Sequence, residues 1–92
     1  MNSSSNALLI DAFAHAERQC ARVALDSDID ADAVRDLTKT LAGMRTDSAL
    51  GNPPTAAAVG ALVRDAATWT GDGHVGLLAA LGAIVRALPR RD

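Results

Sequence analysis

The chain has 92 residues, which is enough for one domain with a single core and too few for two. Its formal net charge of −2 offers no clustered basic surface, so we expect no nucleic-acid partner. Alanine, the residue with the highest helix propensity, occurs 20 times, whereas there is one Trp, one Phe and no Tyr; this composition favours an all-α fold.

The first predicted helix covers residues 7–25, and residues 1–6 are expected to fray ahead of it. Apolar residues recur in this segment three or four positions apart, which is the spacing of one helix face. That apolar face consists of Leu9, Phe13, Ala16, Cys20 and Val23. A second face carries the charged and titratable residues Asp11, His15, Arg18 and Arg22. The pattern is typical of an amphipathic helix with one buried side.

A second helix is predicted over residues 31–44, where the apolar spacing is equally regular. Its apolar seam consists of Val34, Leu37, Leu41 and Met44. Gly43 and the polar run RTDSALGNPP favour an end to this helix near Met44. Residues 45–54 are therefore expected to form a long loop.

The third predicted helix begins after the two prolines at 53–54, with Thr55 as its N-cap. Its apolar seam consists of Val59, Leu62, Ala66 and Trp69, again three and four residues apart. Gly71 can adopt the left-handed backbone conformation that ends a helix, so we expect the third helix to stop there.

The fourth predicted helix, residues 73–88, is apolar almost all round, because residues 74–88 contain a single charge, Arg86. Asp72 is placed to cap its start, and Pro89 ends it and leaves residues 89–92 as a tail. One apolar stripe consists of Leu77, Leu81, Ile84 and Leu88, and a second, about 100° round the helix, of Val75, Leu78 and Val85. The helix is too short for a bilayer, which needs about 20 apolar residues, so we expect no membrane partner.

Four such helices with short connections predict a small antiparallel four-helix bundle in a single domain. The residues expected in its core are Phe13, Leu37, Leu41, Leu62, Trp69, Leu81 and Ile84. No helix of so small a bundle is fully surrounded by its own chain, so the second stripe of the fourth helix is free to bind a partner, unless loop 45–54 folds over it. The predicted partner-binding residues are Val75, Leu78, Ala79, Gly82 and Val85.

The acidic segment at residues 26–36, DSDIDADAVRD, resembles the start of an EF-hand or dockerin calcium loop. The first three ligand positions hold Asp26, Asp28 and Asp30. However, the glycine position of such a loop holds Ala31, and its last ligand position holds Leu37. Helix capping explains this segment better than a calcium loop does. Asp28 or Asp30 accepts hydrogen bonds from the free amides at the start of the second helix, and Asp32 adds negative charge near the positive end of that helix. We therefore predict a helix start, with calcium binding as the alternative.

Two further stretches resemble motifs of known helical families. TDSALG at residues 46–51 resembles the Asp-Ser-Leu that carries the prosthetic arm of acyl carrier proteins, although Leu50 comes one residue late after Ser48. The stretch Trp69-Thr70-Gly71 resembles the Trp-x-Gly turn of the WXG100 family, without the Tyr-x-x-x-Asp signal that follows it there. We interpret the first as a polar loop and the second as the end of the third helix.

The remaining candidates for chemistry are two histidines and one cysteine. His15 and Cys20 lie about 140° apart round the first helix, so they form no dyad within it, and His74 lies in the first turn of the fourth. We expect no cofactor, no metal and no enzymatic activity. A single cysteine cannot form an internal disulfide, which favours a reducing cytoplasm.

The predicted function is a helical protein–protein interaction module that binds another protein or itself, with a homo-oligomer expected. The alternatives are a calcium-responsive module using residues 26–36, and an enzyme or carrier protein with an unrecognised site.

Overall fold

Four helices make up most of the computed structural model, which describes residues 3–71 and 73–89. They are α1 (Ser3–Val23), α2 (Ala31–Ala49), α3 (Ala56–Thr70) and α4 (Val75–Ala87). Within the described ranges no strand occurs, so the predicted all-α bundle is confirmed.

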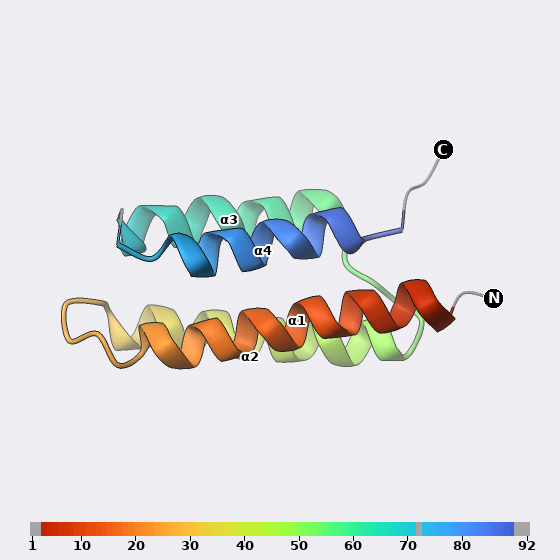
Figure 1. The fold of residues 1–92 in the computed structure, drawn as a ribbon, viewed down its shortest axis with the longest axis horizontal. Coiled ribbons are helices and arrows are strands. Elements are labelled where there is room, and N and C mark those ends of the chain that lie inside the picture. Colours follow the sequence, from red (N-terminus) through yellow and green to blue (C-terminus); the bar gives the residue numbers. More distant parts are fainter. Residues whose placement is uncertain (1–2, 72, 90–92) are drawn as a thin grey trace.

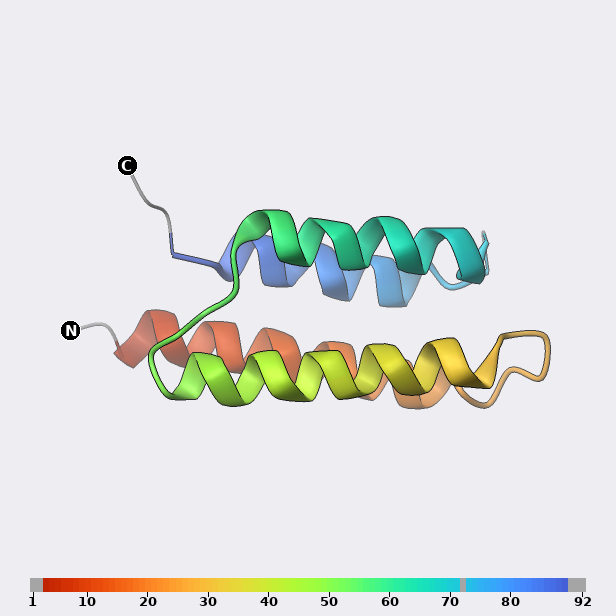
Figure 2. The same cartoon turned by 180° about the vertical axis from the view of Figure 1, so that it is seen from behind.

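The helices are arranged as two antiparallel hairpins, α1–α2 and α3–α4, laid on one another (Figure 1). Helix α1 packs against both α2 and α4, and α3 packs against α4. Residues 24–30 lie at one end of the bundle, beside the end of α3 and the start of α4, and the connection from α2 to α3 lies at the other end (Figure 2). Helices α1 and α4 therefore form one side of the molecule, running in opposite directions.

The apolar face predicted for the first helix is buried along its whole length. Its five members, Leu9, Phe13, Ala16, Cys20 and Val23, form one cluster with buried residues of the other three helices. Of the seven predicted core residues, Leu62 and Trp69 are only half-buried, at the edge of this cluster. The physical reason is that α3 packs closely on α4 alone, so part of its apolar seam has no second neighbour.

Helix α2 continues to Ala49, which corrects the predicted end near Met44 and the predicted loop over 45–54. Gly43 stands at an exposed position of the helix and does not interrupt it. In the polar run that follows, the hydroxyls of Thr46 and Ser48 find acceptors within the helix, one turn back. Ser48, fully buried, donates to the carbonyl of Met44 at 2.8 Å, as serine and threonine can within a helix.

The extension of α2 is also tied to α1 by charge. Arg45 Nε lies 2.7 Å from Glu17 Oε2, although the two atoms are not aligned as a hydrogen bond. Helix α2 ends where Gly51 takes a positive φ of 90°, a conformation that glycine adopts without strain. Only residues 50–55 remain as the connection to α3.

The predicted ends of the other helices are partly confirmed. Thr55 caps α3 by accepting the amide of Ala58 at 3.1 Å, and Gly71 follows α3 with a φ of 63°. Helix α1 already begins at Ser3, although residues 1–6 were expected to fray; residues 1–2 lie outside the described ranges. Helix α4 begins at Val75 after an N-cap position without a side-chain hydrogen bond, which corrects the predicted start at residue 73. The expected cap, Asp72, and tail residues 90–92 lie outside the described residues.

Leu41→Ala should reduce the free energy of unfolding by about 2–5 kcal/mol, because the side chain is fully buried and its removal leaves a cavity. Urea unfolding followed by circular dichroism measures this loss. Leu25→Ala is the matched control, since Leu25 is 86% exposed and its truncation should change stability by no more than about 0.5 kcal/mol. Equal effects of the two substitutions would contradict the described core.

Candidate functional site

The two apolar stripes predicted on the fourth helix both take part in packing. Leu77, Leu81 and Ile84 are fully buried in the core. Leu78 and Val85, two of the five predicted partner-binding residues, are half-buried and pack against the same cluster. They lie about 100° round the helix from the buried stripe, on the side away from α1, where α3 packs against α4. Neither of these two side chains is therefore freely exposed.

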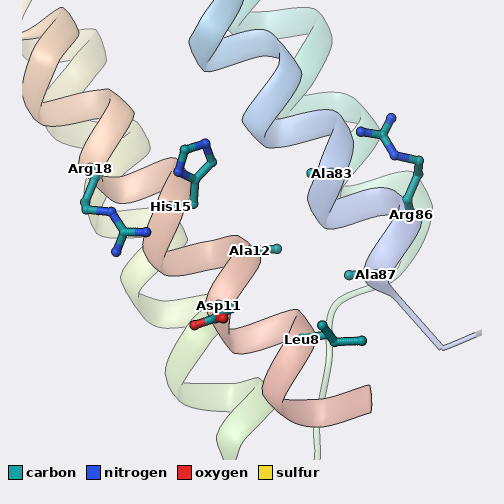
Figure 3. Close-up of a pocket in the computed structure, with 8 residues that line it drawn as sticks. All are labelled: Leu8, Asp11, Ala12, His15, Arg18, Ala83, Arg86 and Ala87. Atoms are coloured by element: carbon teal, nitrogen blue, oxygen red, sulfur yellow. The ribbon is translucent and has the colours of Figure 1, made fainter. Parts of the chain in front are cut away.

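The side of α4 that faces α1 is made of small residues. A Cβ atom added at Gly76 would lie 3.0 Å from Oε1 of Gln19 in α1, so the end of the Gln19 side chain lies against Gly76. About two and three turns further on, Ala83 and Ala87 lie across from Ala12 of α1 (Figure 3). Small side chains on this side allow the helix axes to approach and close the core with few bulky residues.

The other three predicted partner-binding residues, Val75, Ala79 and Gly82, recur at four- and three-residue spacing on the side of α4 that faces away from the core. Arg86 continues the same line, and we call these four residues the outward stripe. Val75 is 71% exposed, Ala79 is exposed and Gly82 is half-buried. The sequence thus identified three members of a solvent-facing stripe, together with two residues that pack inside.

A shallow groove of about 470 Å³ adjoins the outward stripe, between α1 and α4. Its floor is formed by alanines of both helices, and polar side chains stand along its margins (Figure 3). The lining residues are Leu8, Asp11, Ala12, His15, Arg18, Ala83, Arg86 and Ala87. Sequence analysis recognised Asp11, His15 and Arg18 as one helix face but missed the groove, because the groove also requires Arg86 beside that face.

One side-chain pair joins the two hairpins at the end of the bundle where α1 ends and α4 begins. His74 Nε2 and Asp26 Oδ2 are 2.8 Å apart, although the residues are 48 positions apart in the chain. The other carboxylate oxygen of Asp26 accepts the backbone amide of Asp28 at 2.9 Å. The hydrogen bond from the Asp28 amide, and to a smaller extent the contact with His74, lower the pKa of Asp26 from its ordinary value. The carboxylate therefore stays ionised and connects two loops.

Three aspartates of residues 26–36 are directed to separate partners. Asp30 is the N-cap of α2, and its carboxylate accepts a hydrogen bond from the backbone amide of Asp32 at 2.9 Å, as predicted for a helix start. The carboxylate of Asp32 pairs with Arg35 at 3.0 Å, and that of Asp26 faces His74. Among the described residues, no three His, Cys, Asp or Glu side chains gather closely enough to hold a metal ion. The geometry supports the capping interpretation of this segment.

The remaining sequence candidates occupy structural positions. Cys20 is fully buried, and desolvation raises the pKa of its thiol, which disfavours the reactive thiolate. Ser48, the serine of the stretch that resembles acyl carrier proteins, has no exposed surface to carry a prosthetic arm. Trp69 is half-buried near the end of α3, at the edge of the core, and His15 belongs to the groove described above.

Comparison with known proteins gives no family assignment. No family model, no curated protein and no solved structure matches the chain. In the part of the chain that the structure describes, no helix combines the length and the apolar character needed to cross a bilayer.

Asp30→Ala should reduce the free energy of unfolding by roughly 0.5–2 kcal/mol, because the side chain satisfies a free amide at the start of α2. Asp28→Ala is the matched control, since it removes a neighbouring carboxylate that does not form the cap. Titration calorimetry tests the alternative role of the same segment. Calcium binding with a Kd below about 1 mM, the weak end of known loops, would contradict the capping interpretation.

Asp26→Asn should remove a contribution to stability that is lost in acid, and so make the stability of the fold depend less on pH. The folded-state pKa of Asp26 is lowered, so its charge stabilises the fold above the unfolded-state pKa of about 3.9, and this stabilisation is lost as pH falls through the folded-state value. Wild type should therefore melt at a higher temperature than the variant near pH 6, and the two should converge below about pH 4. Asp28→Asn is the charge-matched control; identical melting curves for wild type and Asp26→Asn at every pH would exclude this contribution.

Proposed function

We propose that this chain is a small, non-enzymatic helical module that binds another protein, or a second copy of itself, through the outward stripe of α4. The observation that carries this proposal is the near absence of charge on a solvent-facing helix surface. Among Val75, Ala79, Gly82 and Arg86, only the last is charged, whereas the outward face of α1 carries Asp11, His15, Arg18 and Arg22.

A solvent-facing helix surface is ordinarily polar, because the apolar stripe of an amphipathic helix is used against the core. Helix α4 uses its buried stripe, its α3 side and its α1 side in packing, and the side that is left carries no polar residue except Arg86. Val75 supplies an exposed branched side chain, and Ala79 and Gly82 let a partner backbone come close. These properties suit helix-on-helix docking.

The sequence and structure offer less support for a catalytic role, because Cys20 and Ser48 are buried and bonded within the fold. A reducing cytoplasm remains our expected location, since the single cysteine of the chain is Cys20. We expect neither a nucleic acid nor a membrane as the partner.

Ala79→Lys should abolish the interaction and leave the fold intact, because Ala79 is exposed and a long side chain there keeps a partner backbone from coming close to the outward stripe. Sedimentation equilibrium measures self-association, and co-purification from native cells measures a second protein. Ala61→Lys is the matched control, since Ala61 is exposed on α3, away from the stripe.

The expected result is a loss of association for Ala79→Lys alone, with unchanged melting temperatures for both variants. A wild-type chain that stays monomeric up to about 1 mM, the concentration at which even weak complexes form, and that retains no native partner would contradict the proposal. Equal association by Ala79→Lys and wild type would place the interaction elsewhere and contradict the proposed surface.

A further inference from the structure

We infer that the partner presents an acidic amphipathic helix, which lies along the groove between α1 and α4 with carboxylates toward Arg18 and Arg86. This inference rests on the proposed function and specifies the chemistry of the partner. It follows from the charge of the groove margins, the shape of its floor and the exposed leucine at one end.

The residues that line the groove include two arginines and one carboxylate, in a chain that is acidic as a whole. Arg18 lies on α1 and Arg86 on α4, and their guanidinium groups point away from the alanine floor, toward the outer flanks of the two helices (Figure 3). Asp11 is the one carboxylate among the lining residues. The chain itself has a formal net charge of −2. Charge complementarity therefore favours carboxylates on both flanks of whatever lies in the groove, because opposite charges steer association and fix orientation.

Both guanidinium groups are available for a partner. The ion pairs found in the described part of the chain join Asp32 to Arg35, Glu17 to Arg45 and Asp26 to His74. Arg18 and Arg86 are in none of them, and both are exposed. Arginine pairs with carboxylates through a planar fork of donors, so each guanidinium can hold a Glu or Asp side chain of the partner.

The floor of the groove suits a helix better than a single extended chain. Ala12, Ala83 and Ala87 offer no side-chain atoms beyond Cβ, so a partner helix can approach the two antiparallel helices closely. At the end nearest the N-terminus, Leu8 is 66% exposed and provides an apolar contact for a leucine or valine of the partner. An apolar face between two acidic flanks matches helix-in-groove recognition.

The probe for this inference is a synthetic helical peptide of about 18 residues, or five turns, with leucines on one face and glutamates on both flanks. A second peptide carries lysine in place of every glutamate. Binding to the ¹⁵N-labelled chain is followed by two-dimensional NMR, which reports the affinity and the amides that shift. We expect the glutamate peptide to shift Ala12, Ala83 and Ala87, and the lysine peptide to bind at least about tenfold more weakly.

The double variant Arg18→Glu/Arg86→Glu should lower the affinity for the glutamate peptide by at least about tenfold, because it places like charges on both flanks. Arg64→Glu is the matched control on α3 and should bind as wild type does, since Arg64 is exposed and lies outside the groove. Binding should also weaken as NaCl is raised toward about 1 M, where the screening length falls to about 3 Å.

Three results would overturn the inference: no binding of the glutamate peptide, equal binding of both peptides, or shifts confined to α2 and α3. If the glutamate peptide fails while wild type self-associates and Ala79→Lys does not, the inference is wrong and the proposed function stands, with a second copy as the occupant. If wild type also shows no self-association and no native partner, both are wrong.

Discussion

The structure depends on α1 packing against two helices at once. Helix α1 contacts α2 on one side and α4 on the other, and α3 joins the bundle through α4. The residue at the middle of α1 is Phe13, which is the sole phenylalanine of the chain and is fully buried. With so few bulky side chains available, the core reaches native packing density only if the helix axes come close, and alanine and glycine make that possible.

The same small residues connect the fold to its proposed function. Gly76, Ala83 and Ala87 bring α4 onto α1, and because two of them end at Cβ they also leave the floor of the groove bare. Leu77, Leu81 and Ile84 are buried in the core, and Leu78 and Val85 are half-buried. Their burial determines which side of α4 faces solvent. The proposed docking surface therefore consists of Val75, Ala79 and Gly82, beside a groove lined by Arg18 and Arg86.

Much of the fold could be predicted from local features of the sequence. The apolar spacing of α1 and the caps at Asp30 and Thr55 depend on residues within one or two turns, and all three are confirmed. The extension of α2 could not be predicted in this way. Burial of Ser48 and the pairing of Arg45 with Glu17 both require knowing that α2 lies against α1.

The candidate site was less predictable for the same reason. Apolar spacing showed that α4 has two stripes, but which side is left for solvent depends on which helices flank it. Leu78 and Val85 are half-buried because α3 packs on the side of α4 away from α1. The pair of His74 with Asp26 and the groove beside Arg86 likewise join residues that are distant in the chain and adjacent only in the fold.

The central claim is the orientation of α4 about its own axis, because this orientation decides which of its residues lie in the core and which form the outward stripe. Nuclear Overhauser contacts in a labelled sample test it most directly. The account predicts contacts between the α-protons of Gly76 and the side chain of Gln19, which lie together where α4 meets α1. Contacts from Gln19 to the methyl groups of Leu78 or Val85 would contradict it, since they would place the α3-facing side of α4 against α1.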